Sequence, residues 1–303
     1  GNAISVSDLD AAEAAVEELR VTLSVLQGTL TLSTTAGLTF TAGDGTADTA
    51  MTFRGSQAAI NAALSGLQYL PRVDFNGTDT LTVTVNDLGN FGSGPAPNVT
   101  RTVNLTVRPV NDDPTVTLPG TPPVTLYTVY EDTNLPLPGI VVGDAKDSAY
   151  APVTLKVTLT ALHGTVTVNT NVSGGVGVGG VQNNGSSSAS LTGTPAAINA
   201  TLAHATGIVY KGLLNYNNYS TDQDPDADEV LLVTVDDLGN VGSGGAKQAQ
   251  NSVTISVLQA NDAPSITSPG PRTLDEDAPN YYIPLAVTDV DADESPVDPL
   301  RAV

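Results

Sequence analysis

The segment VTVNDLGNFGSG at residues 83–94 occurs a second time in the chain, as VTVDDLGNVGSG at residues 233–244. Both copies begin with alternating apolar and polar residues and continue into a turn that contains Asp, Gly and Asn. Alternation with a period of two is typical of a strand that buries one face, and Gly and Asn are typical of the turn that ends it. The segment therefore predicts a β-strand and turn that the chain uses twice.

Two further repeated sequence segments set the size of the repeating unit. GSQAAINAAL, which starts at Gly55, returns as GTPAAINATL at Gly193, 138 residues later. VNDDP, which starts at Val110, returns as ANDAP at Ala260, 150 residues later. Because the spacing grows between these pairs, the second copy carries an insertion, which we place at about residues 211–229. Self-similarity at one period is the mark of a tandem array of domains.

The two ends of the chain also match each other. DLDAAEAAVEELR, from Asp8, returns as DVDADESPVDPLR, from Asp289. The last residues therefore match the same part of the repeating unit as the first residues do, as expected for a segment of a longer tandem array. We expect a first repeat that lacks its first strand, a second repeat with the insertion, and the incomplete start of a third, at residues 1–112, 113–262 and 263–303.

Short alternating runs dominate each copy. LRVTLSV, GTLTLS and LTVTV in the first copy correspond to LKVTLTAL, GTVTVN and LLVTV in the second. The helical signal is the repeated AAINA segment, which Ser56 or Thr194 can cap at its N-terminus. About seven strands per repeat predict an all-β protein of tandem Greek-key β-sandwiches, each with a short helical crossover. The glycine-rich stretch at residues 173–190 is expected to be a flexible hairpin tip.

The composition argues against several classes of partner. The 303-residue chain has 32 Asp and Glu against 11 Lys and Arg, and its formal charge of −21 repels nucleic acids and anionic lipid surfaces. No apolar run approaches the roughly 20 residues that span a bilayer, so we expect no direct membrane insertion. Because the chain has no cysteine, it has no disulfide framework, and calcium is the candidate for a stabilising cross-link.

Two segments carry a resemblance to a known family. VTVNDLGNFGSG with the VTRTVNLTVRPVNDDP that follows it resembles the end of a cadherin repeat, and TLDEDAPNYYIPLAVTDVDADE at residues 273–294 resembles the start of one. The likeness covers nearly the whole chain and is closest to the cadherin-like repeats of very large bacterial surface proteins and adhesins. It implies calcium-dependent β-sandwich repeats in a secreted protein at the bacterial cell surface, with a structural, adhesive role.

The resemblance also implies which residues bind calcium, because in this family the ion lies at the junction between two repeats. The second junction would use Glu131, Asn261, Asp262, Asp289 and Asp291. The first junction would use Asn111, Asp112, Asp144 and Asp237, with its glutamate lost upstream of the first residue. A further half-site at the top of the first copy would use Asp8, Asp10 and Asp87.

One position departs from the family pattern. The second copy reads GDAKDS, with Lys146 where the second aspartate of the D-x-D motif would stand. Either Asp147 replaces that ligand or the first junction binds fewer ions. Calcium takes six to eight oxygens at about 2.3 to 2.6 Å, so carboxylates from separate loops converge on it only when the two domains hold one orientation. Calcium is therefore expected to stiffen the joint.

Other candidate chemistries rest on weaker patterns. DQDPDADE, at residues 222–229, has the spaced aspartates of a calcium loop but lacks the glycine and distal glutamate of an EF-hand, so a solvated acidic loop fits equally well. No pair of carboxylates stands out for acid–base catalysis. His163 and His204, the two histidines, occupy non-equivalent positions, and His163 lies in a predicted turn, which disfavours a catalytic triad. We therefore expect no enzymatic activity.

The partners expected are neighbouring repeats or further subunits of the same protein. An unpaired sheet edge in the first repeat and a first strand within residues 271–303 would allow end-to-end association by strand addition. The rival hypothesis is a binding module whose insertion contacts a cell-surface glycan or protein. Tyr210, Tyr216 and Tyr219 lie in this region, where they either stack on sugars or fill the edge of the sandwich.

Overall fold

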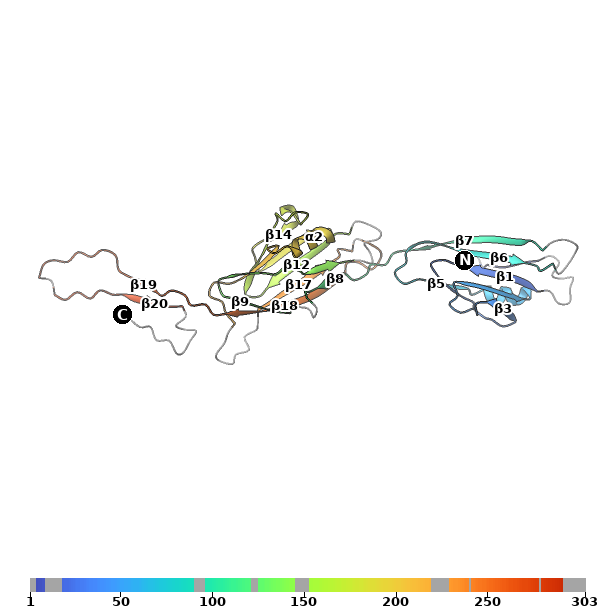
Figure 1. Ribbon diagram of the computed structural model, residues 1–303, viewed down its shortest axis with the longest axis horizontal. Helices are drawn as coiled ribbons and strands as arrows, with labels where there is room; N and C mark the ends of the chain where they lie inside the picture. The colour runs from blue at the N-terminus through green and yellow to red at the C-terminus, as the bar shows by residue number, and fades with distance from the viewer. Residues whose placement is uncertain are drawn as a thin grey trace. The chain divides into compact units, whose positions relative to one another are not determined.

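The structure is a computed structural model that describes residues 4–8, 18–89, 96–120, 125–144, 153–218, 229–239, 241–277 and 279–290. The chain divides into two compact units, which we call unit 1 (Gly1–Val110) and unit 2 (Asn111–Val303). Among the described residues, both units consist mainly of β-strands, and each has one short α-helix (Figure 1). The all-β class that the sequence predicts is confirmed.

Unit 1 contains two antiparallel sheets. Its strands are β1 (Leu19–Ser24), β2 (Gly28–Thr31), β3 (Leu38–Ala42), β4 (Ala50–Gly55), β5 (Gln68–Pro71), β6 (Gly77–Asn86) and β7 (Asn98–Val107). The larger sheet has the order β3-β4-β1-β6-β7, and β2 pairs with β5 in the smaller one. In β1, Leu19, Val21 and Leu23 are buried, and the residues between them are partly exposed. The alternation seen in the sequence therefore selects the face that packs into the core.

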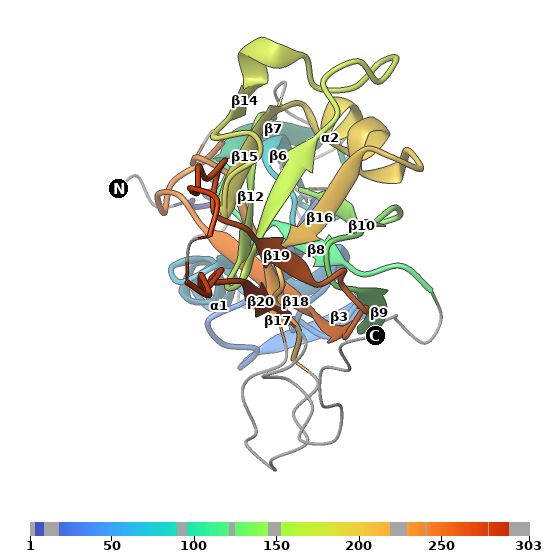
Figure 2. The same cartoon turned by 90° about the vertical axis from the view of Figure 1, so that its left-hand side faces the viewer.

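Unit 2 repeats this plan and adds strands to it. It contains β8 (Thr115–Thr117), β9 (Leu126–Tyr130), β10 (Asn134–Pro136), β11 (Val141–Gly143), β12 (Leu155–Ala161), β13 (Gly164–Val168), β14 (Val181–Gln182), β15 (Ser188–Gly193), β16 (Ile208–Gly212), β17 (Glu229–Asp236) and β18 (Gln248–Leu258). The sheets have the orders β14-β15-β12-β17-β18-β9, β10-β16-β13 and β11-β8. Strand β9 runs parallel to β18, whereas the other neighbours are antiparallel. Figure 2 shows β10 beside β16, and β14 beside β15.

The helical crossover forms in both units, as expected. Helix α1 (Gln57–Leu64) is capped by Ser56, whose hydroxyl accepts from the Ala59 amide at 3.3 Å. Helix α2 (Pro195–Ala203) is capped by Thr194 in the same way. These caps satisfy one of the free N–H groups at each helix start.

The asparagine of AAINA has a role that the sequence did not reveal. Asn199 holds both backbone groups of Val142, with Val142 N donating to Asn199 Oδ1 at 2.8 Å and Asn199 Nδ2 donating to Val142 O at 2.7 Å. Asn61 holds Val6 in unit 1 with the same pair of bonds, at 2.8 and 2.9 Å. Each helix therefore anchors the extended segment that passes beside it.

The glycine-rich stretch at residues 173–190 contains the expected hairpin, between β14 and β15. The glycines that precede β14, however, belong to the folded unit. Val176 is buried in the core, and its amide donates to Thr201 Oγ1 of α2 at 2.8 Å. A single-turn 3₁₀ helix, η2 (Val178–Gly180), follows. Composition alone predicted a flexible tip, because composition carries no information on the contact between Val176 and Thr201 of α2.

The last described strands form a separate pair. Strand β19 (Ser265–Thr267) is antiparallel to β20 (Ala286–Thr288), with Ile266 opposite Val287. The same arrangement joins β8 to β11, where Val116 lies opposite Val142. Every residue of β19 and β20 is exposed.

Candidate functional site

Two residues expected at the first junction are in direct contact at one end of unit 2. Asn111 Nδ2 donates to Asp237 Oδ2 at 2.6 Å and to Gly245 O at 2.8 Å. Asp237 Oδ1 accepts from the Gly239 and Lys247 amides, each at 2.8 Å. Both Asn111 and Asp237 are buried. The linker is therefore tied to the turn after β17 by a carboxylate whose two oxygens already accept hydrogen bonds.

The other residues expected at this junction lie on the same segments. Asp144 directly follows β11 and is buried, whereas Asp112 is half-buried. The neighbouring Asp113 forms an ion pair with Lys247, with 3.1 Å between Oδ1 and Nζ. Lys146 and Asp147 lie outside the described residues.

At the opposite end of unit 2, Glu131 joins the end of β9 to the end of β18. Its amide donates to Leu258 O at 2.8 Å, and its Oε1 accepts from the Ala260 amide at 2.7 Å. Its Oε2 accepts from Asn217 Nδ2 at 3.4 Å. Because Glu131 is buried, its carboxylate depends on these donors. The residue that resemblance assigned to calcium thus lies where the chain leaves the sandwich.

Asn215 connects two further carboxylates at this end. Its side-chain amide lies 3.2 Å from both Asp262 Oδ2 and Asp132 Oδ2, and assigning the amide nitrogen to this position makes it a donor to both carboxylates. The backbone amide of Asn215 donates to Asp132 Oδ1 at 3.3 Å. Asn261 is exposed, and its Nδ2 donates to Asp262 O at 3.1 Å. The beginning of the insertion therefore contributes an amide between carboxylates from two segments.

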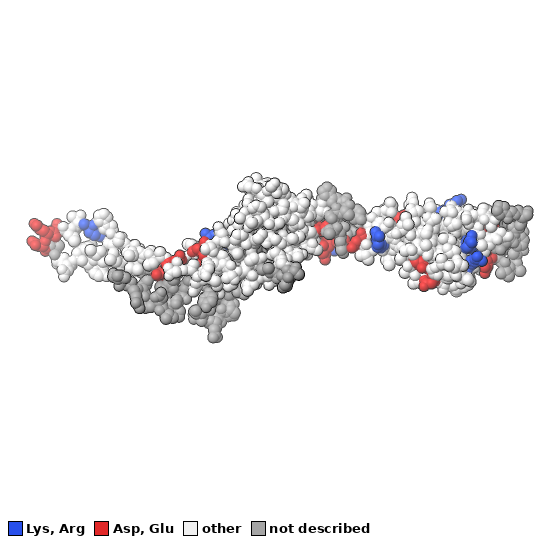
Figure 3. Space-filling view, viewed as in Figure 1, with Lys and Arg blue, Asp and Glu red and all other residues white. Residues whose placement is uncertain are grey.

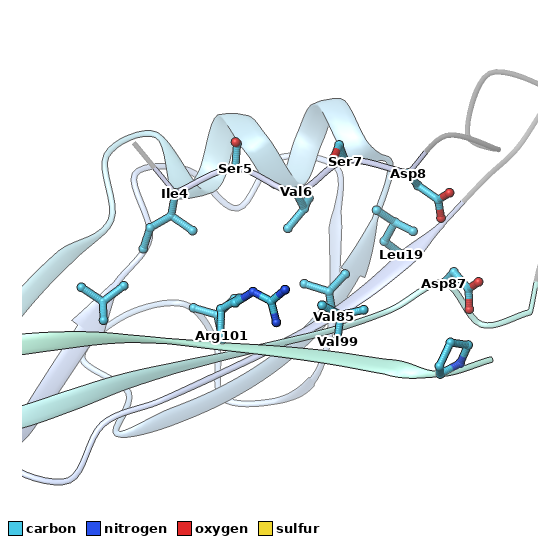
Figure 4. A pocket seen from close by; sticks show the side chains of 13 residues that line it. Ile4, Ser5, Val6, Ser7, Asp8, Leu19, Val85, Asp87, Val99 and Arg101 are labelled. Atoms are coloured by element: carbon cyan, nitrogen blue, oxygen red, sulfur yellow. The ribbon is translucent and has the colours of Figure 1, made fainter. Parts of the chain in front are cut away.

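The structure describes only some of the remaining residues that were expected to bind calcium at this junction and in unit 1. Asp289 follows β20 and is half-buried, while Asp291 and Asp10 lie outside the described residues. Asp8 and Asp87 line the same end of one pocket in unit 1 (Figure 4). The Asp8 amide donates to Gln57 Oε1 at 2.9 Å, and Asp87 Oδ1 accepts from the Gly89 amide at 3.1 Å.

Carboxylates alone do not form a metal site in the part of the chain that the structure describes. No group of three or more His, Cys, Asp or Glu side chains there could hold an ion. The acidic atoms gather in a few places, including both ends of the unit 2 sandwich, and much of the surface in view is uncharged (Figure 3). A cation at either end would need amide or carbonyl oxygens as well as carboxylates, which calcium accepts.

Two buried carboxylates that sequence reasoning missed support the hairpins. Asp79 accepts from the amides of Leu26 and Gln27, at 3.2 and 2.8 Å, and from the Tyr69 hydroxyl at 2.9 Å. Glu229 accepts from the Leu162 and His163 amides, at 2.8 and 2.6 Å. The two carboxylates are 150 residues apart, the same spacing as the repeat, and this alignment could have paired them. Glu229 is fully buried, so the last residue of DQDPDADE is not solvated.

These networks shift the pKa values of the groups inside them. Burial alone would raise the pKa of Asp79, but the amides of Gln27, Thr80 and Leu26 and the Tyr69 hydroxyl bring it below its usual value. Burial, together with the Asp79 carboxylate, raises the pKa of Tyr69 to about 12. Burial and the charge of Glu229 also raise the pKa of Tyr210. Both tyrosines are therefore neutral at ordinary pH, and Asp79 is ionised.

The histidines and two of the three tyrosines occupy structural positions. The rings of His163 and Tyr216 stack with centroids 4.6 Å apart, and His163 Nδ1 lies 3.3 Å from Glu229 Oε2. Tyr210 is fully buried in the core. His204 caps the C-terminus of α2. These positions favour the edge-filling role for Tyr210 and Tyr216, whereas Tyr219 and residues 222–228 lie outside the described residues.

Comparisons with known proteins find similarity only among solved structures. No family model matches the chain, and no curated protein matches it. Mouse cadherin-23 EC22-24 is 15% identical over 89% of this chain and 65% of that chain, with a TM-score of 0.35. Human CDH23 EC21-23 is 16% identical over 96% and 75%, with a TM-score of 0.32. The surface layer protein SbsC, domains 4-9, is 16% identical over 89% and 28%, with a TM-score of 0.23.

The chain spans 65% of the cadherin-23 fragment and 54% of a protocadherin gamma B7 fragment with extracellular cadherin domains 1-4. Among the helices that the structure describes, none has the length and apolar character required to cross a membrane.

Proposed function

We propose that this chain is a non-enzymatic structural segment of an extracellular adhesin or fibre of the bacterial surface, in which calcium stiffens tandem β-sandwich repeats. One observation carries the proposal. At each end of unit 2, a buried acidic side chain holds the linker to the sandwich, through Asn111 and Asp237 at one end and through Glu131 and Ala260 at the other.

The donor set at the second end fits calcium better than other metals. Asp132, Asp262, Asn215 and Glu131 offer oxygen ligands, and no cysteine is present. Asn215 now offers its nitrogen to the carboxylates, and rotating the amide by 180° would present its oxygen instead. Hard divalent cations prefer such oxygens, and calcium tolerates irregular geometry. A bound ion would also offset part of the charge of −21.

Calcium removal tests the proposal. Extracellular calcium modules bind with dissociation constants of about 10⁻⁴ to 10⁻³ M, so about 10 mM calcium should raise the melting temperature by roughly 3 to 10 °C over chelator. Small-angle scattering should show a narrower distribution of maximum dimensions with calcium. Equal melting temperatures and equal scattering in calcium and chelator would contradict the proposal.

A matched pair of variants separates binding from general charge effects. Asp262→Asn removes one proposed ligand and should lower the calcium-dependent shift and the number of ions bound in calorimetry. Asp74→Asn removes the same charge from a turn in unit 1 where φ is +59°, a conformation that asparagine also adopts readily. Its calcium response should equal that of the parent chain. An unchanged response in Asp262→Asn would exclude this residue as a ligand.

A further inference from the structure

The outer face of the larger sheet in unit 1 carries a row of polar side chains that crosses four strands. Arg54 of β4 lies opposite Arg20 of β1. Arg20 also lies opposite Asn86 of β6, which in turn lies opposite Asn98 of β7. In β1 and β4 the residues that alternate with the arginines are buried, so the arginines lie on the face away from the core. The four residues of the row line a pocket of about 430 Å³ together with Thr22, Thr41, Thr52 and Thr84.

This row has more hydrogen-bond donors than acceptors. Arg54 Nε is shielded from solvent and has no hydrogen-bond partner among the described residues. Neither Arg20 nor Arg54 forms an ion pair with a carboxylate that the structure describes. Asn86 Nδ2 donates to Asn98 Oδ1 at 3.1 Å, which fixes the Asn98 amide with its own Nδ2 as a further donor. The pocket therefore lacks the oxygen acceptors that its donors require.

The opposed arginines also carry an electrostatic cost. Residues directly opposite each other in an antiparallel pair have Cβ atoms about 4.5 to 5.5 Å apart, and like charges at such positions destabilise the sheet. An anion between the two guanidinium groups would replace this repulsion with charge-assisted hydrogen bonds. A carboxylate suits the place, because its two oxygens can accept from the parallel N–H groups of a guanidinium.

Unit 2 has the same row, but there its charge is neutralised within the sheet. Lys156 of β12 lies opposite Thr192 of β15 and opposite Asp236 of β17. Asp236 lies opposite Gln248 of β18, whose Nε2 donates to Asp236 Oδ2 at 2.7 Å. By the alignment of the repeats, unit 2 thus has a threonine in place of one arginine and a carboxylate in place of one amide. Of the two rows, only that of unit 1 has an excess of positive charge.

The lining of the pocket favours a sugar over a peptide as the source of that anion. It consists of two arginines, two asparagines and four threonines, so it offers no apolar cavity for the side-chain anchors on which peptide binding depends. Sugars present hydroxyl groups along their length, which suit threonine hydroxyls and amides. Neighbouring strands are about 4.8 Å apart, so the row offers donors over about 14 Å. Nucleic acid is disfavoured by the charge of −21.

We propose that this pocket binds an acidic glycan, with a sugar carboxylate between the guanidinium groups of Arg20 and Arg54. The sugar hydroxyls lie against the threonines and accept from Asn98 Nδ2. The site lies within unit 1 and uses no metal ion, so it is independent of the calcium contacts proposed above. It gives one repeat of the segment an adhesive surface of its own, on the face of a sheet rather than in the insertion of unit 2.

Titration of the full ¹⁵N-labelled chain with trigalacturonate, followed by NMR in metal-depleted buffer, tests the ligand. We expect the Nε–H resonance of Arg54 to shift in a saturable manner. Galactotriose, which has the hydroxyl groups without the carboxylates, should shift it far less. A tri-glutamate peptide, which has the carboxylates without the sugar, should also bind far more weakly. No saturable shift with trigalacturonate, or equal binding of tri-glutamate, would overturn the proposal.

A matched pair of arginine variants tests the site against a general charge effect. Arg54→Gln removes one guanidinium group from the pocket and should weaken trigalacturonate binding by about tenfold or more. Arg101→Gln removes the same charge from the opposite face of the sheet, where Arg101 lines the other pocket of unit 1 (Figure 4). Its affinity should stay near that of the parent chain. Equal losses in the two variants would contradict the site.

Asn86→Asp gives unit 1 the carboxylate that unit 2 has at the same position. The variant should fold, because Asn86 Oδ1 accepts from the Leu88 amide as Asp236 Oδ1 accepts from the Leu238 amide. The new carboxylate would pair with Arg20 and repel the ligand, so trigalacturonate binding should fall by about tenfold or more. Parent-like affinity in Asn86→Asp would overturn the proposal. Because metal ions are absent throughout, none of these outcomes depends on whether calcium binds.

Discussion

At the scale of single residues, both units share a corner made of a glycine, a tyrosine and a carboxylate. The ring of Tyr69 covers Gly28 in unit 1, and the ring of Tyr210 covers Gly164 in unit 2. A Cβ on Gly28 would lie 2.5 Å from Tyr69 Cε2. The glycines of LQGT and LHGT are therefore needed for the close approach of a ring.

Gly164→Ala should destabilise unit 2, because the new methyl group collides with the ring of Tyr210 and with the Lys211 carbonyl. We expect the free energy of unfolding to fall by about 1 to 3 kcal/mol, as for an overpacked core. Urea denaturation followed by circular dichroism measures this change. Gly177→Ala is the control, because a Cβ there meets no atom within 4 Å. Equal stability of the two variants would contradict the role of the tyrosine ring.

The pKa of Tyr69 predicts a loss of stability in alkali. Its value is raised to about 12 in the folded protein, above the usual value of about 10. A raised pKa contributes stability that is complete below pH 10 and is lost as the pH rises through 12. The free energy of unfolding of the parent chain should therefore fall between pH 10 and 12 more steeply than that of Tyr69→Phe. Tyr282→Phe, which removes an exposed hydroxyl, should follow the parent curve.

At the scale of elements, the two helices act as clamps on neighbouring extended segments. Asn199→Ala would leave the amide and carbonyl of Val142 without their partners. The loss should be about 1 to 3 kcal/mol in the free energy of unfolding. Hydrogen exchange at the Val142 amide should accelerate with it. Asn171→Ala, an exposed position outside the helix, should change neither quantity, and unchanged exchange at Val142 in Asn199→Ala would refute the clamp.

The elements themselves were largely predictable. The alternating runs became β1, β2, β6, β12, β13 and β17, and the capped alanine-rich segments became α1 and α2. Short-range alternation and capping determine such elements, because each depends on residues close together in the sequence. The order of strands across the sheets depends on contacts between distant residues, such as Leu126 and Thr254 in the parallel pairing of β9 with β18, and was not predicted.

At the scale of the whole molecule, the two units have separate cores. Leu23→Ala creates a cavity in the core of unit 1 and should cost about 2 to 5 kcal/mol there. Native-state hydrogen exchange should show faster opening of β1 and β4 and unchanged protection of β12 and β15. Leu159→Ala, the counterpart in unit 2, should show the reverse pattern. Faster opening of both cores in either variant would mean that the units unfold together.

Only some of the candidate calcium residues could be identified from the sequence. Resemblance assigned Asn111, Asp237 and Glu131 to junctions, and the structure places each where a linker meets the sandwich. The sequence resemblance could not indicate Asn215 and Asn217, because these residues belong to the insertion, which has no counterpart in the first copy. Whether calcium binds there remains the prediction tested above.

The sequence by itself determined the repeat, the all-β class, the strands and the helix caps, because alternation and capping act between residues near one another. Only the tertiary structure decided which carboxylates are buried. Asp79 and Glu229 cap turns that lie 53 and 67 residues away in the sequence, and nothing local distinguishes them from solvated acids. Only the tertiary structure, too, decided that β9 runs parallel to β18, because this pairing joins residues that are far apart in the sequence and meet through folding.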